Sequence, residues 1–190
     1  MSEQRTQHHA VAPSAWITRF AALVPAGARV LDVAAGSGRH ARFFAARGAR
    51  VVAVDIDADA LATLADVPGV ATRVADLEGD AWPFADASFD AIVATNYLHR
   101  PRLSHLLATL AADGVFLYET FAAGNEAFGR PSRPAFLLRE NELFDAFRER
   151  LVVVAFEQGV IVEDGRRAVV QRIAAIGRAQ GWPPPLPAVG

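Results

Sequence analysis

The chain of 190 residues contains no cysteine and no lysine. The absence of cysteine excludes disulfide bonds, thiolate nucleophiles and the zinc or iron–sulfur sites that are built on cysteine. All 19 basic residues are arginine, and against 21 acidic residues they give a formal net charge of −2. This balance argues against a general binder of nucleic acid or membrane surfaces, because such binding depends on excess positive charge.

Long hydrophobic runs are also missing. No uninterrupted apolar stretch reaches the roughly 18 residues that span a bilayer, and the first residues lack the apolar segment of a signal peptide. We therefore expect a cytoplasmic protein that does not enter the membrane. Hydrophobic residues make up 52% of the chain and charged residues 21%, which is typical of one globular domain.

Both ends of the chain differ in composition from its middle. Residues 1–12 are polar and show no periodicity, and residues 179–190 end in a proline-rich run. We expect both ends to be flexible. The remaining residues, 13–178, are predicted to form a single domain without an internal linker.

Short apolar runs alternate with helical patterns along the middle of the chain. Strands are predicted at residues 28–33, 49–55, 70–75, 89–95 and 114–120. Helices are predicted at 14–23 and at about 38–47, 58–66 and 101–111. This alternation is typical of an α/β fold, a doubly wound, Rossmann-like sheet that is mostly parallel and has helices on both faces.

The last third departs from this alternation. A helix predicted at 137–150 is followed by two β-rich runs, 151–158 and 166–176, with a few residues between them. A parallel crossover needs a dozen or more residues, so these runs must form an antiparallel hairpin. The complete prediction is a seven-stranded sheet that ends in this hairpin, where Arg166 and Arg167 are expected to be solvated.

The loop after the first predicted strand carries Gly36 and Gly38. Without a Cβ, glycine lets backbone amides approach a ligand, and the start of the next helix attracts negative groups. The spacing Gly36-x-Gly38-x-x-Ala41, with Asp55 ending the second strand, also satisfies a relaxed dinucleotide-binding pattern. A tight turn that binds nothing is the alternative interpretation.

Asp32, inside the first strand, distinguishes between the two candidate cofactors, a nicotinamide dinucleotide and S-adenosylmethionine. A carboxylate at this place would repel a pyrophosphate and attract an ammonium group. S-adenosylmethionine (SAM) carries both an amino group and a sulfonium cation. Asp32 therefore favours SAM over a nicotinamide dinucleotide.

Three stretches carry a resemblance to a known family: VLDVAAGSG (30–38), VVAVDID (51–57) and VADLEGDAWPFADASFDAIVATNYLH (74–99). In order and spacing they resemble the successive motifs of class I SAM-dependent methyltransferases. The resemblance covers roughly residues 14–175. It implies transfer of a methyl group from SAM to an acceptor, with release of S-adenosylhomocysteine (SAH).

The resemblance also implies roles for residues after the first two strands. Asp32 and the loop from Ala34 through Gly36 to Gly38 would hold the methionine part of SAM, and Asp55 would accept hydrogen bonds from both ribose hydroxyls. The family usually has glycine where this chain has Ala34. Because alanine is also small, we expect cofactor binding to survive this difference.

The later motifs imply the remaining cofactor contacts. Ile56 would pack on the adenine, and Asp76 with the backbone of Leu77 would bind its amino edge. Thr95 and Asn96, at the end of the fourth strand, would close over the methionine part. Together these motifs are far more specific than the glycines alone.

Residues 95–101, TNYLHRP, replace the Asn/Asp-Pro-Pro-aromatic box of family members that methylate exocyclic amines of bases and glutamine. That difference disfavours this substrate class. Tyr97 and His99 are the candidate catalytic residues, and His99 is a candidate base because a histidine accepts a proton near neutral pH. Alternatively, His99 is a helix-entry residue that bonds a backbone carbonyl.

Residues 118–136 follow the fifth strand and exceed the usual loop length of about 2–6 residues. We expect this segment to bind the acceptor, with Tyr118, Glu119, Asn125 and Arg130 as its contact residues. A packing flap that covers only the cofactor is the alternative. No metal site is predicted, because the five histidines and the scattered acids lack metal-ligand spacing.

The sequence favours a small-molecule acceptor and a monomer or weak homodimer, with nucleic acid as the less favoured acceptor. Two other functions stay open. A nicotinamide-dependent oxidoreductase would share the glycine loop and Asp55, although Asp32, Asp76 and the terminal hairpin disfavour it. A non-catalytic scaffold would bind the cofactor without transferring a methyl group.

Overall fold

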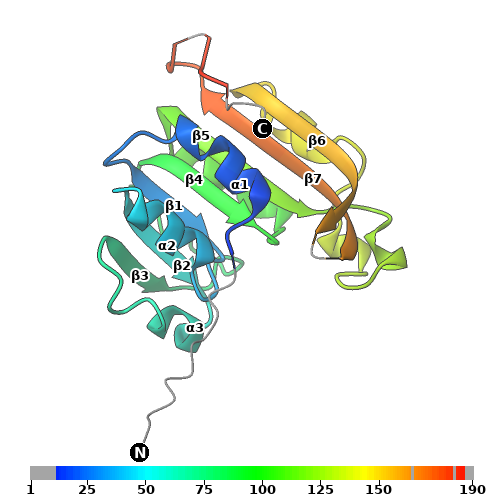
Figure 1. The fold of residues 1–190 in the computed structure, drawn as a ribbon, viewed down its shortest axis with the longest axis horizontal. Coiled ribbons are helices and arrows are strands. Elements are labelled where there is room, and N and C mark those ends of the chain that lie inside the picture. The colour runs from blue at the N-terminus through cyan, green and yellow to red at the C-terminus, as the bar shows by residue number, and fades with distance from the viewer. Residues whose placement is uncertain (1–11, 164, 182, 187–190) are drawn as a thin grey trace, which may run out of the picture.

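The computed structural model describes residues 12–163, 165–181 and 183–186, and its centre is a seven-stranded sheet (Figure 1). The strands are β1 (Arg29–Val33), β2 (Arg50–Asp55), β3 (Val70–Val74), β4 (Phe89–Thr95), β5 (Leu110–Phe121), β6 (Leu151–Glu163) and β7 (Arg166–Gly177). Their order is β3-β2-β1-β4-β5-β7-β6. Strands β1 to β5 pair in parallel, and β7 is antiparallel to both β5 and β6. The predicted sheet is therefore confirmed.

Helices flank this sheet on both faces. Within the described ranges they are α1 (Ala15–Phe20), α2 (Arg39–Ala46), α3 (Ala58–Ala62), α4 (Leu103–Thr109) and α5 (Glu142–Phe147). Helices α1, α2 and α3 contribute to one hydrophobic core, and α4 and α5 contribute to another. In Figure 1, α1 and α2 lie on the near face of the sheet, which is the face of the first core.

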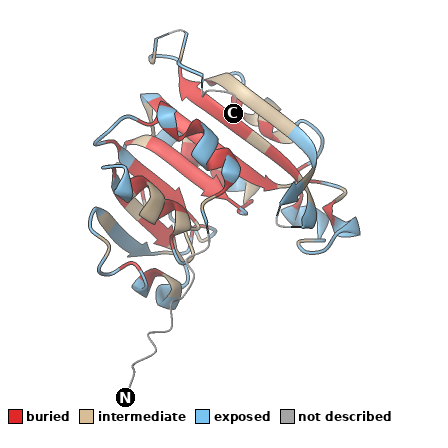
Figure 2. Ribbon diagram, viewed as in Figure 1, coloured by how far each residue is buried: buried red, intermediate tan, exposed pale blue. Residues whose placement is uncertain are grey.

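The two cores follow from the alternation of side chains along a strand. On β1, Val30 packs in the core that contains Trp16 of α1, whereas its neighbour Leu31 packs in the core that contains Phe147 of α5. The same alternation holds along β4 and β5. The central strands are consequently buried, while the edge strands β3 and β6 are more exposed (Figure 2).

One predicted helix is shorter in the structure than in the sequence pattern. Helix α5 occupies only part of the predicted range 137–150. The amide of Leu138 instead donates to the carbonyl oxygen of Phe121 at 3.0 Å, and Asn141 takes a left-handed φ of +59° just before the helix. Pairing with the end of β5 thus overrides the helical pattern of residues 137–141.

The hairpin is confirmed, but the prediction that residues 159–165 form its connection is wrong. Strand β6 continues to Glu163, and its last residues, including Val160 and Val162, pair with the start of β7. Valine and isoleucine favour extended backbone, so the strand does not end until the turn itself. The hairpin is longer than the pattern indicated, and its far end lies beside the segment that follows β5 (Figure 1).

Some predictions concern residues near the ends of the chain. Residues 1–11 of the predicted flexible end 1–12, and residues 182 and 187–190 of the predicted flexible end 179–190, lie outside the described residues. Among the described helices, none has the length and the apolar character needed to cross a membrane.

Candidate active site

The strand order creates a crevice at the carboxyl ends of β1 and β4. Strand β1 lies between β2 and β4, and ligands of open α/β sheets bind at such a switch point. A cavity of about 180 Å³ opens there, and we call it the switch-point cavity. Most of its lining residues are predicted site residues: Ala34, Asp55, Ile56, Asp76, Leu77 and Tyr97.

Asp32 lies two residues before this lining, on β1, and is 1% exposed. Neither carboxylate oxygen receives a hydrogen bond of good geometry from a described residue. Burial raises the pKa of Asp32 to about 7, and the nearby amide of Ala41 and the charge of Arg39 offset only part of this effect. A buried acid without a partner is costly, so this site favours a cationic group beside Asp32.

The loop after β1 has a left-handed backbone at three positions. The φ angles are +52° at Ala34, +53° at Gly36 and +76° at Gly38. Glycine adopts this conformation without strain, whereas Ala34 does so at a cost of about 1–2 kcal/mol. The turn brings the amide of Gly36 within 2.7 Å of Asp55 Oδ2, which joins the ends of β1 and β2.

The far end of the cavity combines an apolar and a polar surface. Ile56 is 67% exposed although it is a large hydrophobic residue. Asp76 Oδ1 accepts a hydrogen bond from the amide of Glu78 at 2.8 Å, which fixes the turn after β3. The carbonyl oxygen of Leu77 accepts a hydrogen bond from Arg102 Nε at 2.9 Å. These contacts hold the turn that borders the cavity.

The candidate catalytic residues Tyr97 and His99 both lie near this cavity. The hydroxyl of Tyr97 is buried and has no hydrogen-bond partner among the described residues. Burial raises the pKa of Tyr97 above its ordinary value, so the phenol stays protonated. His99 Nδ1 lies 3.3 Å from an oxygen of Glu78, another lining residue. The catalytic roles of both residues stay predictions.

A larger hollow of about 830 Å³ lies on the other side of the β4 end. Asn96, the residue before Tyr97, lines it. The amide of Asn96 donates to the carbonyl oxygen of Glu119 at 3.0 Å and ties the ends of β4 and β5 together. The hollow also contains the predicted residues Glu119, Asn125 and Arg130. We call it the arginine pocket, after four arginines in its lining: Arg39, Arg130, Arg166 and Arg167.

Glu119 is held by a buried network at the wall of the arginine pocket. Its two oxygens face Ser14 Oγ at 2.9 Å and Arg172 Nη1 at 3.3 Å. Burial raises the pKa of Glu119, and the contacts with Ser14 and Arg172 oppose that shift. The amide of Ser14 also donates to His40 Nε2 at 3.1 Å, and burial lowers the pKa of His40 to about 3, so this imidazole is neutral.

Two predicted acceptor contacts have their side chains in hydrogen bonds within the protein. The hydroxyl of Tyr118 is buried and donates to the carbonyl oxygen of Tyr97 at 2.6 Å. The amide of Asn125 donates to the carbonyl oxygen of Pro131, and its oxygen accepts from the amide of Val169. Asn125 thereby fixes the segment after β5 against β7.

The sequence did not assign Arg39, Arg166 or Arg167 to the site. Arg39 directly follows Gly38, which is a signal that could have identified it. Arg166 and Arg167 were expected to be solvated, and they are exposed, but the hairpin brings them to the wall of this pocket. Their place depends on the register of β7 with β5, which no local motif encodes.

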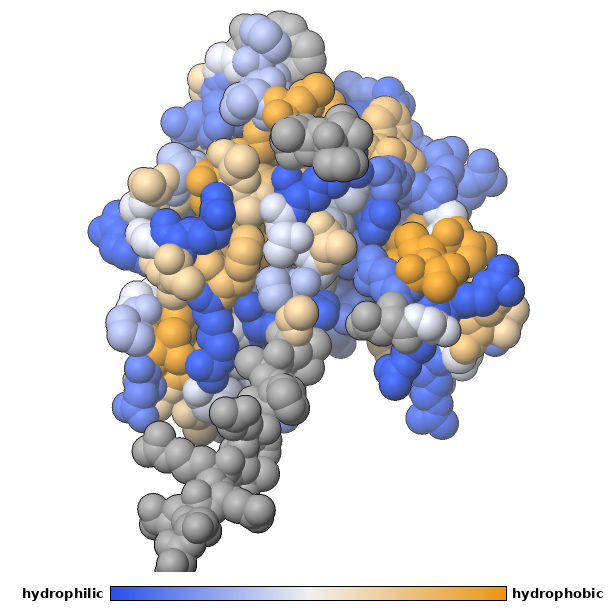
Figure 3. Space-filling view, in the orientation of Figure 1, coloured by the Kyte–Doolittle hydropathy of each residue, from blue (hydrophilic) through white to orange (hydrophobic). Residues whose placement is uncertain are grey.

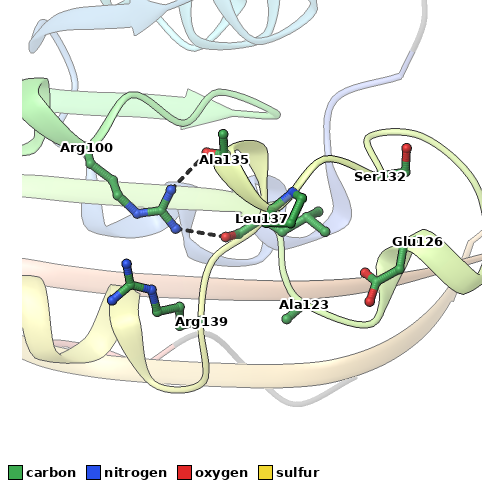
Figure 4. Close-up of a pocket in the computed structure, with 8 residues that line it drawn as sticks. Arg100, Ala123, Glu126, Ser132, Ala135, Leu137 and Arg139 are labelled. Atoms are coloured by element: carbon green, nitrogen blue, oxygen red, sulfur yellow. Dashed lines mark hydrogen bonds between the residues drawn. The ribbon is translucent and has the colours of Figure 1, made fainter.

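A third hollow, of about 410 Å³, lies between Arg100 and residues 123–139 (Figure 4). Arg100 donates to the carbonyl oxygens of Ala135 and Leu137, both at 2.8 Å, and pairs with Glu142 at 2.5 Å. Its guanidinium is therefore used within the protein. Arg100 anchors the segment after β5 to the element that precedes α4.

The chain has the Rossmann-like fold of solved SAM-dependent methyltransferase structures. Residues 30–112 match a family model described as a methyltransferase domain. This range runs from β1 into β5 and contains every residue predicted to bind the cofactor. The resemblance indicated by the sequence motifs is confirmed.

Two proteins with similar sequences are also methyltransferases by name. The chain is 46% identical over 70 residues to a demethylmenaquinone methyltransferase of Thermobifida fusca (35% of this chain, 30% of the relative). It is 42% identical over 86 residues to a ribosomal RNA small subunit methyltransferase C of Chromohalobacter salexigens (41% and 24%). The chain thus spans less than a third of either relative.

A solved structure matches most of the chain. It is described as a SAM-dependent methyltransferase of Methanosarcina mazei, and it aligns with a TM-score of 0.67 over 87% of this chain and 98% of its own. Sequence identity is 17%, so this likeness concerns the fold.

Proposed function

We propose that the protein is a SAM-dependent methyltransferase that acts on a small-molecule acceptor and releases SAH. The observation that carries the proposal is the buried carboxylate of Asp32, which has no hydrogen-bond partner among the described residues and lies beside a loop of positive φ angles. A cationic ligand satisfies Asp32, and the amino group and the sulfonium of SAM are both cationic. The sheet order and the matched family model support the same function.

The lining of the switch-point cavity fits the other parts of SAM. The exposed Ile56 offers an apolar surface for the adenine, and burying that surface would stabilise the complex. Asp55 Oδ1 and Oδ2 each accept one amide hydrogen bond and keep free lone pairs for the ribose hydroxyls. Asp76 and the backbone of Leu77 lie beside them for the adenine edge.

When bound, SAM supplies a methyl group on a sulfonium, whose sulfur leaves as a neutral thioether, so the donor is already activated. The chain then has to align the acceptor and exclude water. Alignment alone can lower a barrier by about 7–11 kcal/mol. No nucleophilic residue and no metal are required for this reaction.

His99 is the proposed base where the acceptor must lose a proton. Its Nδ1 faces Glu78, which leaves Nε2 as the free acceptor nitrogen. We expect His99→Gln to lower kcat and to change how the rate depends on pH, because a general base is removed, while SAH affinity is unchanged. A pH–rate profile identical to that of the unaltered protein would exclude this role.

The acceptor is proposed to occupy the arginine pocket. Its volume of about 830 Å³ lies within the usual range for small-molecule sites of about 300–1,000 Å³. One relative is named for demethylmenaquinone and another for ribosomal RNA, so both kinds of acceptor belong in the test. The formal charge of −2 favours the small molecule.

Thermal unfolding with added ligand tests the cofactor. We expect SAH to raise the melting temperature and NADH to leave it unchanged, since a ligand of the native state stabilises it by about 2.7 kcal/mol at 100 times its Kd. Stabilisation by NADH alone would favour the oxidoreductase. Transfer of label from methyl-labelled SAM to small molecules or RNA then distinguishes an enzyme from a scaffold that binds SAH without turnover.

A further inference from the structure

The arginine pocket differs in charge from the chain as a whole. The chain has a formal charge of −2, yet this one pocket collects four basic side chains and two acidic ones. The two acidic side chains are those of Glu119 and Glu163.

Glu163 is the cross-strand partner of Arg166 at the end of the hairpin, but among the described residues neither acid forms a salt bridge with one of the four lining arginines. Glu119 and Glu163 both face Arg172, at 3.3 Å and 3.7 Å, and Arg172 does not line the pocket. No salt bridge joins a lining arginine to an acid within the part of the chain that the structure describes. The pocket therefore offers positive charge to an occupant.

The arginines reach the pocket from three parts of the fold. Arg39 begins α2, and its Nη2 lies 3.4 Å from the hydroxyl of Thr95 at the end of β4. Arg166 and Arg167 begin β7, and Arg130 belongs to the segment after β5. An anion held among them would lie beside the strand end that separates the pocket from the switch-point cavity.

One wall of the pocket is apolar and includes Phe121, Phe128, Ile161 and Val170. The guanidinium of Arg167 lies 5.1 Å from the ring centre of Phe128, and the ring is 40% exposed. In the space-filling view, hydrophobic atoms surrounded by hydrophilic ones occupy the side of the molecule that carries the far end of the hairpin (Figure 3). This wall suits an occupant with an apolar part.

We propose that the methyl acceptor is a small organic anion, with a carboxylate or phosphate bound by the arginines and an apolar part packed near Phe128. This inference rests on the proposed function and names the class of its acceptor. The volume exceeds that of a bare inorganic ion. The basic side chains gather in one pocket and do not form a stripe, which favours a small molecule over RNA.

Calorimetry on the full chain saturated with SAH tests the proposal with three matched probes: phenyl phosphate, benzoate and benzyl alcohol. We expect the two anions to bind at least about tenfold more tightly than the neutral alcohol, because charge-assisted hydrogen bonds are the stronger kind. The double variant Arg166→Gln/Arg167→Gln should weaken both anions by a similar factor and leave SAH affinity unchanged. The double variant Arg50→Gln/Arg150→Gln, which removes the same charge at two exposed positions outside the pocket, is the control.

Several results would overturn the proposal. The first is that benzyl alcohol binds as tightly as the anions, and the second is that inorganic phosphate binds as tightly as phenyl phosphate. The proposal would also be overturned if the double variant bound the anions as tightly as the unaltered protein, or if neither aromatic anion bound. An oligoribonucleotide that binds through Arg166 and Arg167 while phenyl phosphate does not would assign the pocket to RNA and also overturn it. If the anions bind as expected and SAH does not bind, the proposed function fails and the anion site stands.

Discussion

The two hollows on either side of the β4 end differ in how the chain builds them. The switch-point cavity uses residues 34–97, and each contributing turn directly follows a strand. The arginine pocket draws on residues from Ser14 to Val170, including both strands of the terminal hairpin. A site made of consecutive strand ends can be predicted from sequence motifs, whereas a site made by long-range pairing requires the register of the sheet.

The largest expected effect is a loss of SAH affinity when a residue of the switch-point cavity is replaced. Asp55→Ala removes the partner of the Gly36 amide and the proposed acceptor for the ribose hydroxyls. We expect SAH affinity to fall about 100-fold, the equivalent of two lost hydrogen bonds to a charged group. Calorimetry provides the measurement, with Asp86→Ala, an exposed acid outside both hollows, as the control. Unchanged SAH affinity would show that the cofactor is placed wrongly.

The pH dependence of stability compares two buried groups: Asp32, two residues before the lining of the switch-point cavity, and His40, which accepts a hydrogen bond from Ser14 in the lining of the arginine pocket. The pKa of Asp32 is about 7 in the folded protein and 3.8 ordinarily, so the stability it contributes is complete below about pH 4 and declines as pH rises to 7. The pKa of His40 is about 3 when folded and 6.5 ordinarily, so its contribution is complete above pH 6.5 and declines as pH falls to 3. Between about pH 4 and 6.5 the two trends oppose each other.

Single variants should separate these trends. Relative to the unaltered protein, we expect the unfolding free energy of Asp32→Asn to rise with pH by up to about 1.4 kcal/mol per unit, and that of His40→Gln to fall by a similar amount. Urea unfolding at pH 4.5, 5.5 and 6.5 measures both slopes. Parallel curves for all three proteins would contradict the burial of these groups.

A smaller effect tests the contact between the ends of β4 and β5. Tyr118→Phe removes the hydrogen bond to the carbonyl oxygen of Tyr97 and changes no other described side-chain contact of its hydroxyl. We expect a loss of about 1 kcal/mol in unfolding free energy. SAH affinity should stay the same, and a large decrease would mean that Tyr118 acts on the switch-point cavity through Tyr97.

The smallest effect concerns the loop after β1. Ala34→Gly relieves the strain of a φ of +52° but makes the unfolded chain more flexible. The two terms oppose each other, and we expect a net stabilisation of about 0.5 kcal/mol. Thermal unfolding of the variant without ligand is the measurement. Destabilisation would indicate that the alanine methyl makes favourable contacts in the cavity.

The sequence allowed the sheet and the switch-point cavity to be predicted because both depend on local patterns. Apolar runs defined β1 to β4, and the residues after these runs meet at one edge of a parallel sheet. The same reasoning failed at residues 137–141, where pairing of Leu138 with Phe121 replaces a helix. It also left Arg166 and Arg167 unassigned, because their neighbours depend on a hairpin whose length the pattern underestimated.

The place of β7 between β5 and β6 has a consequence for the chain during synthesis. Strand β6 leaves the ribosome before β7, yet in the described sheet it pairs with β7 and with no other strand. The edge of β5 is therefore unpaired until the hairpin is made, and an unpaired edge can bind other strands. The growing chain holds every lining residue of the switch-point cavity by Tyr97 but completes the arginine pocket only at Val170. The nascent chain thus contains every lining residue of the proposed donor site well before it contains every lining residue of the proposed acceptor site.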